Sequence, residues 1–448
     1  MLAENAIPPT AVTEESHHRK FFLQSGWMVI ATVVSGLSAF AVHILSKWVS
    51  NLEYEAAAAM IQIINLMAIP SLGLQLVFAH QTSAAVTVAQ RRRLVGTFKT
   101  VMRWIFYIWL AMVLYVVVEH NRLQAQLHLS NPWSLWFMLL SGLMTLWTPM
   151  FNGLLQGRQN FMWMGWVAII NSAGRVLLAA VIVLCFHGEA AGIIAGILLG
   201  LTIGVAAAFW QNWDLWKEPS EKFDVWEWLR HVVPLTLTSG VGQFLQTADG
   251  VVAPVYLGAG GAAAPYLFGG TLARAIPLAT APLAAVMFPK LVHRKARSEK
   301  GGPDFLVLTF LGTLVLGCVG ALGLTIASPL LIKLFSKAEF VSIVPLIPLF
   351  AWAMVPLCLG NVLLNNLNAH SYFKPVPVLV ALAAGYWIAL LNFHASFKMV
   401  IETLFVFNAL FLTICLLFTW RLRLLEKKKD GTNSTTESLR TATKNSHG

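Results

Sequence analysis

Charged side chains are scarce in this sequence, and their scarcity excludes a soluble globular fold. They make up 11% of the 448 residues, and hydrophobic residues make up 57%, whereas soluble domains carry about 25% charged residues. The long apolar runs predict membrane-spanning helices, since the strands of a membrane barrel would be short and alternating. Cysteine is rare too. The four thiols lie within apolar runs and lack metal-ligand spacing, which excludes a disulfide framework and a cysteine-based metal centre.

The predicted fold class is an all-α polytopic membrane protein with about twelve transmembrane helices. A helix needs about 20 apolar residues to cross a bilayer. The third apolar run is shorter, and we expect it to recruit residues from the basic segment before it. The expected spans are 22–45, 56–80, 104–119, 133–155, 161–186, 190–211, 232–257, 263–288, 304–328, 342–367, 375–393 and 398–420.

Lysine and arginine gather in alternate connections between the spans, and this pattern orients the chain. Two clusters, 91–103 and 290–300, and the residues after 420 fall on one side of the membrane. Because basic loops stay in the cytoplasm, both termini are expected there. The net charge of +11 therefore serves orientation, and nucleic acid is not an expected partner. The opposite side holds only Lys47, Arg122, Lys333, Lys337 and Lys398.

The two halves of the chain resemble each other. Ala68-Ile69-Pro70 matches Ala275-Ile276-Pro277, and segment 152–156 resembles 361–365 at nearly the same offset. Six spans in each half predict a parallel repeat about an axis along the membrane normal. The expected organisation is a cytoplasmic segment (1–21), a first lobe of six spans (22–211), an amphipathic linker forming a helix on the cytoplasmic surface (212–231), a second lobe of six spans (232–420) and a basic, disordered cytoplasmic tail (421–448).

Three charges interrupt the apolar runs: Arg175, Arg274 and Asp249. A charge near the bilayer centre costs roughly 2.5–3.5 kcal/mol on insertion scales, so each one needs a partner or a watery cavity. Asp249 has two open roles, a salt bridge to Arg274 on the neighbouring span or the coupling of H⁺ or Na⁺. In both cases the interior stays net positive. That charge predicts a cationic cavity for an anionic substrate, with Arg175 and Arg274 as the substrate-binding residues.

Polar side chains recur at steps of three or four residues along one face of several spans. A single polar side chain in a span more often forms a hydrogen bond between helices than part of a binding site. Taken together, the stripes predict the polar lining of a hydrated cavity. No catalytic residue, cofactor or metal ligand is expected. The expected lining residues are Gln243, Gln246, Asn152, Asn171, Asn361 and Asn365.

Three segments carry a resemblance to a known group of proteins. Segments 152–184, 245–258 and 266–291 resemble the fourth-to-fifth, seventh and eighth helices of polysaccharide and O-antigen flippases. These belong to the multidrug/oligosaccharidyl-lipid/polysaccharide export (MATE-like) superfamily. The resemblance is a diffuse pattern over nearly the whole chain, without a short invariant motif. It implies two six-helix lobes with alternating access to a central cavity, in which cationic residues map onto Arg175 and Arg274.

The resemblance implies a function as well as a fold. The implied substrate is an oligosaccharide linked to undecaprenyl pyrophosphate, flipped across the bacterial inner membrane for surface polysaccharide or lipopolysaccharide synthesis. Membrane lipids and other polysaccharide-assembly proteins are the expected partners, and the chain is expected to be a monomer. Asp249 maps onto an acidic position of the seventh helix that is a candidate for ion coupling.

Two other functions stay open. An ion-coupled multidrug antiporter has the same fold, but cation exporters often carry an acid in the first helix, and 22–45 contains none. A membrane polysaccharide polymerase or ligase ranks lower, because the periplasmic segments 120–132 and 329–341 are short and hold no carboxylates paired for acid–base chemistry. The lipid II flippase branch is disfavoured, since its members usually add two helices after the twelfth.

Overall fold

The computed structural model describes residues 27–28, 30–85, 87–127, 129–297 and 305–445. The regular secondary structure in these ranges is all helical, and eight helices there are long and apolar enough to cross a membrane, or nine with the bent pair α2–α3. The chain is therefore an all-α polytopic membrane protein, as the hydropathy predicts. The predicted segment 1–21 lies outside the described residues.

Two compact units divide the chain. The first comprises Met1–Thr236, Pro254–Phe268 and Lys333–Phe340, and the second comprises Leu237–Ala253, Gly269–Ile332 and Val341–Gly448. The domain boundaries expected from the sequence stay a prediction.

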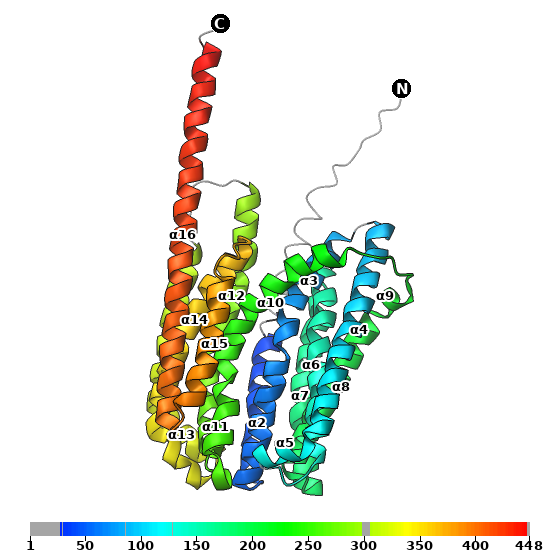
Figure 1. The fold of residues 1–448 in the computed structure, drawn as a ribbon, viewed down its shortest axis with the longest axis vertical. Coiled ribbons are helices and arrows are strands. Elements are labelled where there is room, and N and C mark those ends of the chain that lie inside the picture. Colours follow the sequence, from blue (N-terminus) through cyan, green and yellow to red (C-terminus); the bar gives the residue numbers. More distant parts are fainter. Residues whose placement is uncertain (1–26, 29, 86, 128, 298–304, 446–448) are drawn as a thin grey trace, which may run out of the picture. The chain divides into compact units, whose positions relative to one another are not determined.

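The first unit is a bundle in which α6 packs against α3 and α8, and α8 packs against α7. Figure 1 shows α4, α6, α7 and α8 running side by side. After helical residues 30–41, its elements are η1 (Val42–Lys47), α2 (Asn51–Met67), α3 (Ile69–Ala84), α4 (Val88–Val118), α5 (His120–Gln126), α6 (Trp133–Gly157), α7 (Phe161–Phe186), α8 (Glu189–Gln211), α9 (Trp213–Lys217) and η2 (Ala259–Gly261).

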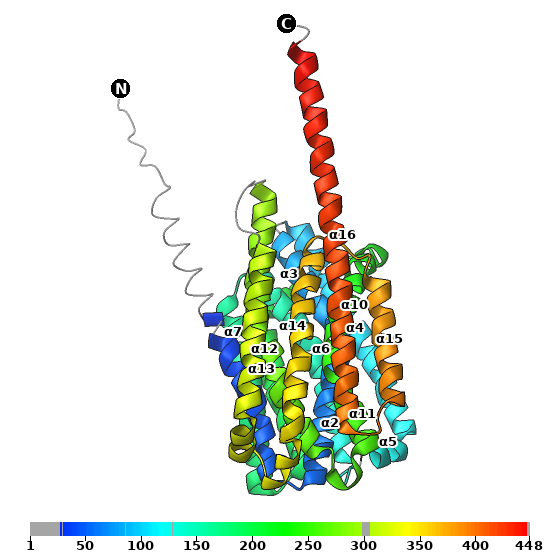
Figure 2. The ribbon, with the colours of Figure 1, turned by 90° about the vertical axis from the view of Figure 1, so that its left-hand side faces the viewer.

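The second unit is built on α16, which packs against α14 and α15. Figure 2 shows these helices side by side, with α13 in the same bundle. Its own helices are α14 (Ile347–Ala369), α15 (Val376–Asn392) and α16 (Phe397–Asn445), while five elements contribute residues to both units: α10 (Val225–Thr247), α11 (Asp249–Leu257), α12 (Ala264–Arg297), α13 (Phe305–Phe335) and η3 (Ala338–Leu346).

The third span begins inside the basic segment, as expected. The helix α4 starts at Val88, where Thr87 and Gln90 form a capping box: each side chain accepts a hydrogen bond from the backbone N–H of the other. Such a box satisfies two of the amide groups that a helix start leaves unpaired. The prediction that this span recruits the preceding basic residues is confirmed.

The second span is broken. Helices α2 and α3 meet at Ala68 with a bend of 43°, and Pro70 stands in the first turn of α3, where a missing N–H is tolerated. The matching triplet around Pro277 lies inside the continuous helix α12. The two halves thus treat the same short motif differently.

Two segments differ from the sequence-based expectation. Segment 212–231 is not one surface helix: α9 has five residues, and α10 begins at Val225. Glu218, the residue directly after α9, has an extended backbone (φ −70°, ψ 144°). Pro219 follows it, and a proline disfavours the helical conformation of the residue before it. Residues after 420, expected to be disordered, continue α16 as far as Asn445. Strong helix formers such as Leu, Glu, Lys and Arg dominate the start of that stretch.

A glycine every four residues in α8 allows α7 to approach closely. A methyl group on Gly196 would lie 2.2 Å from the backbone nitrogen of Ala179, and one on Gly200 would lie 2.3 Å from that of Arg175. Small residues at this spacing let the backbones of membrane helices touch. The sequence signal for this contact, not used above, is the G-x-x-x-G repeat at Gly192, Gly196, Gly200 and Gly204.

Replacing Gly200 by Ala is expected to destabilise the protein by about 1–3 kcal/mol, the usual cost of overpacking. The matched control is Gly323→Ala in α13, where nothing lies within 4 Å of the added carbon. That variant should be neutral or slightly stabilising, because Ala is the better helix former. Thermal unfolding of the purified proteins in detergent measures both. Equal melting temperatures for the two variants would contradict the close α7–α8 contact.

Candidate functional site

Asp249 and Arg274 form a buried ion pair within the second unit. The Arg274 Nη2 atom lies 2.8 Å from Asp249 Oδ1 and 2.7 Å from Oδ2. Asp249 is 0% exposed and Arg274 is 9% exposed. The helix break at Ala248 makes Asp249 the first residue of α11, where the helix dipole stabilises a carboxylate.

Neighbouring groups complete the surroundings of Arg274. Its Nε donates a 2.6 Å hydrogen bond to the backbone carbonyl of Gln246, and its guanidinium lies 5.4 Å from the centre of the Phe350 ring. Its Nη1 is buried and has no hydrogen-bond partner in the described part of the chain. The salt bridge left open by the sequence is therefore formed, and the pair is neutral. Substrate binding by Arg274 and ion coupling by Asp249 stay predictions.

Arg175 pairs with no acid in the part of the chain that the structure describes. It lies near the middle of α7, and its Nε donates a 2.8 Å hydrogen bond to Asn171 Oδ1 one helical turn earlier. Asn171 is the only hydrogen-bonding partner of Arg175 among the residues that the structure describes. Because Asn171 is neutral, the charge of Arg175 is left uncompensated. The close approach of Gly200 holds the Arg175 backbone against α8.

The other predicted lining residues are divided between the two units. Asn152, on α6, is half-buried, and its Oδ1 lacks a hydrogen-bond partner within the described ranges. Gln243 and Asn361 are half-buried in the second unit, and Asn365 is exposed. A methyl group on Gly242 would lie 2.6 Å from Asn361 Oδ1, so α10 and α14 approach closely there. The prediction that these residues line one cavity is neither confirmed nor contradicted.

Two buried acids that were not expected from the sequence lie at the start of α2. Glu53 is 5% exposed and Glu55 is 2% exposed. Glu53 accepts hydrogen bonds from the Ser130 hydroxyl and, at 3.0 Å, from the N–H of Ala190 in the first turn of α8. Glu55 accepts a 2.7 Å hydrogen bond from the N–H of Ala263, just before α12. Each carboxylate thus caps the start of another helix, a favourable place for negative charge.

Comparison with solved structures identifies the fold. The sequence matches no protein-family model and no curated protein. The structure is similar to an inward-facing multidrug resistance MATE family transporter of the MOP superfamily, with a TM-score of 0.68, 11% identity, and 90% of this chain and 99% of that chain covered. The chain has the MATE-like fold. It is also similar to the lipid II flippase MurJ in an inward closed conformation, with a TM-score of 0.68, 14% identity, and coverage of 87% and 86%.

The resemblance noted in the sequence is therefore confirmed at the level of the MATE-like fold. Identities this low carry the fold alone, so the substrate has to be argued from the residues of this chain. No group of three or more His, Cys, Asp or Glu side chains within the described residues could hold a metal ion.

For the MATE-like chain, Glu55→Ala is expected to lower the free energy of unfolding by about 1–3 kcal/mol, because the buried Ala263 amide loses its acceptor. The matched control is Glu402→Ala, whose side chain is 52% exposed and pairs with Lys398. That change should stay within about 0.5 kcal/mol. Chemical or thermal unfolding in detergent measures both variants, and a Glu55 variant as stable as the control would refute the capping role.

Proposed function

We propose that this MATE-like chain flips an oligosaccharide linked to undecaprenyl pyrophosphate from the cytoplasmic to the periplasmic leaflet of the bacterial inner membrane. Its product would serve the synthesis of surface polysaccharide or lipopolysaccharide. One observation carries the proposal: Asp249 neutralises Arg274, whereas among the described residues Arg175 hydrogen-bonds only to the neutral Asn171. Within the described residues, Arg175 is therefore a cation in a span without a compensating charge, and an anionic guest would balance it.

The chemistry of Arg175 favours a phosphate group as that guest. A guanidinium presents a planar fork of donors that fits phosphate oxygens in pairs. With Nε held by Asn171, the two Nη groups are the donors left to a substrate. A pyrophosphate head would enter the cavity while its lipid tail stays in the bilayer, and alternating access would carry the head across.

Net transport would need a driving force. A gradient of H⁺ or Na⁺, or removal of the product on the far side, would drive net transport, and no cofactor is needed. We propose that the chain acts as a monomer, in contact with membrane lipids and beside other polysaccharide-assembly proteins. The substrate would leave chemically unchanged.

An ion-coupled multidrug antiporter is the second candidate. It is favoured by the similarity to a multidrug resistance MATE family transporter over 99% of that chain. The charge of Arg175 opposes it, because a cation that pairs with no acid among the described residues repels cationic drugs. A membrane polymerase or ligase would lengthen or transfer the glycan, so it would change the mass of the lipid-linked substrate.

Reconstitution tests the three functions together. Purified protein is placed in vesicles that contain a fluorescent lipid-pyrophosphate oligosaccharide, and a membrane-impermeant quencher reports which leaflet holds the label. Flipping predicts that the inner-leaflet label becomes accessible, with the substrate mass unchanged by mass spectrometry. Extrusion of a cationic dye without lipid flipping would favour the antiporter, and a change in substrate mass would favour the enzyme.

A further inference from the structure

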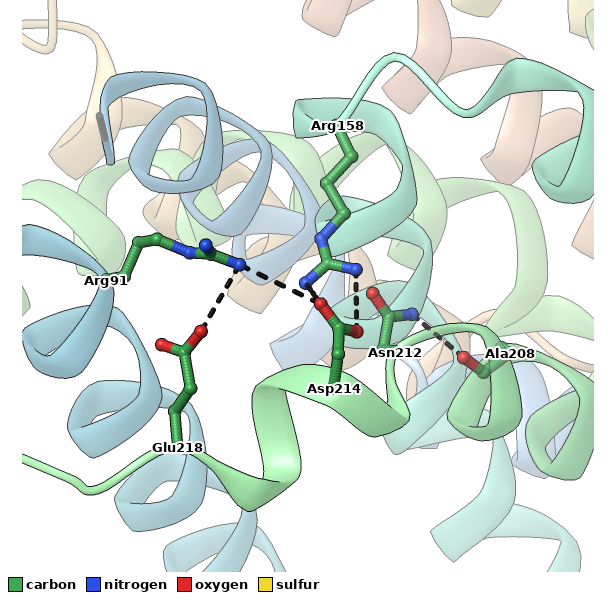
Figure 3. Close-up of polar contacts among 6 residues, drawn as sticks. All are labelled: Arg91, Arg158, Ala208, Asn212, Asp214 and Glu218. Atoms are coloured by element: carbon green, nitrogen blue, oxygen red, sulfur yellow. Dashed lines mark hydrogen bonds and ion pairs between the residues drawn. The ribbon is translucent and has the colours of Figure 1, made fainter. Parts of the chain in front are cut away.

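Ion pairs hold the connection between α8 and α10 to the start of α4 and the end of α6, within the first unit (Figure 3). Asp214 on α9 receives a bidentate pair from Arg158, at 2.9 Å and 2.8 Å. Arg91, at the start of α4, lies 3.8 Å from the same carboxylate and 3.3 Å from Glu218. In Figure 3 the guanidinium groups of Arg91 and Arg158 both point toward the carboxylate of Asp214.

Further contacts fasten the rest of the connection. Arg92 lies 3.8 Å from Glu221, and its carbonyl accepts a 3.1 Å hydrogen bond from the Glu221 N–H. Lys99 donates to the carbonyl oxygens of Trp216 and Glu218, at 3.0 Å and 3.3 Å. Partial burial by itself would raise the pKa of Asp214, but the hydrogen bond and charge of Arg158 lower it below its usual value. Asp214, Glu218 and Glu221 are thus all paired with arginines of this unit.

The helix α4 and the segment from α9 to the first turns of α10 also carry exposed cations that form no ion pair within the described residues. Two of them lie over exposed indole rings: Lys217 lies 5.7 Å from the centre of the Trp213 ring, and Arg230 lies 5.7 Å from that of Trp226. Trp213 is 45% exposed and Trp226 is 63% exposed. The full set of such cations is Arg93, Arg103, Lys217, Lys222 and Arg230.

One of these cations, Arg103, lies next to apolar surface of a span. Three residues after Arg103, about 4.5 Å along the helix axis, α4 begins to expose apolar side chains, and Tyr107 and Ile108 are 62% and 61% exposed. Such a surface faces lipid tails in a spanning helix. Tryptophan and basic residues next to it belong at the level of the headgroups.

We propose that the face formed by Arg103, Lys217 and Arg230, with the indoles of Trp213 and Trp226, binds the headgroups of anionic phospholipids. A basic residue close to an anionic membrane surface contributes about 1 kcal/mol of attraction, or about fivefold in affinity. A soluble acidic partner would need none of the exposed indoles or the adjoining apolar surface. Binding there would hold the α8–α10 connection at the membrane surface. This inference stands apart from the flipped substrate.

The test uses the purified full chain in detergent, incubated with either phosphatidylglycerol or phosphatidylcholine, with native mass spectrometry counting the lipids retained. We expect the unmodified chain to prefer phosphatidylglycerol. The triple variant Arg103→Gln, Lys217→Gln and Arg230→Gln should lose that preference by about fivefold or more. Retention of phosphatidylglycerol equal to that of the unmodified chain would overturn the proposal.

Two controls test whether lipid binding depends on this face, and not on the net charge of the protein or on misfolding of the variant. The charge-retaining variant Arg103→Lys, Lys217→Arg and Arg230→Lys should keep the preference for phosphatidylglycerol. So should a variant that removes three exposed cations expected at the periplasmic ends, Arg122→Gln, Lys333→Gln and Lys398→Gln. Loss of the preference in this second control would mean that net charge alone attracts the lipid, and it would overturn the assignment. So would tighter binding of a soluble acidic peptide than of phosphatidylglycerol.

Discussion

Replacing Arg175 by Gln is expected to abolish flipping while leaving the protein folded and abundant. Removing one partner of a buried, hydrogen-bonded charge pair costs about 2–5 kcal/mol of binding, so substrate affinity should fall by at least about 30-fold. The free energy of unfolding, in contrast, should rise. Arg175 has only Asn171 as a hydrogen-bonding partner within the described residues, so a neutral Gln removes the cost of an unpaired charge in the membrane.

This opposition of activity and stability separates a substrate contact from a structural role. The vesicle assay measures flipping, and thermal unfolding in detergent measures stability. Arg175→Lys keeps the charge but not the fork of donors, so it should retain partial activity. Asn171→Ala should weaken flipping less than Arg175→Gln, because it only loosens the guanidinium. Normal flipping by a stable Arg175→Gln protein would contradict the proposed function. Loss of both flipping and stability would indicate that Arg175 has a structural role.

Breaking the Asp249–Arg274 pair is expected to have the largest effect on stability. Replacing one partner, by Asp249→Asn or Arg274→Gln, leaves a charge at a site where Asp249 is 0% exposed and Arg274 9% exposed. Such changes cost about 3–5 kcal/mol in proteins. The double variant removes both charges and should recover most of that loss. The matched control pair is Lys398–Glu402, which is 66% and 52% exposed and should contribute less than about 1 kcal/mol.

The double variant also decides what Arg274 does. Unfolding measurements on the two single variants and the double variant give the coupling energy of the pair, and a coupling below about 1 kcal/mol would contradict a buried ion pair. If Arg274 only neutralises Asp249, the stable double variant should still flip lipid. If Arg274 binds substrate, the double variant should be stable and inactive. A flipping rate that no longer depends on the H⁺ or Na⁺ gradient would assign coupling to Asp249.

Parts of the candidate site could be predicted from local spacing. Asn171 and Arg175 are four residues apart, so they share a helix face whatever surrounds them, and their hydrogen bond follows. The early start of α4 could also be predicted, because the span 104–119 is too short to cross a bilayer alone. Both inferences need only the periodicity and rise of a helix.

Other parts depended on contacts between distant segments. Glu53 and Glu55 precede the expected span 56–80, and nothing in the local spacing gives them partners. Only the fold brings them to the starts of α8 and α12. The backbone carbonyl of Gln246, and not its side chain, receives Arg274. Side-chain spacing along a helix cannot reveal such a contact.

The sequence by itself determined the membrane class, the approximate spans and the three charges within them, because hydropathy and charge are properties of each segment taken alone. The tertiary structure decided which of those charges are compensated. Asp249 meets Arg274 because α10 ends at Thr247 and α11 begins again at Asp249, next to a helix whose register places the guanidinium 2.7 Å away. Among the described residues Arg175 hydrogen-bonds only to Asn171, because the part of α8 packed against it is glycine, which brings no side chain to pair with a cation.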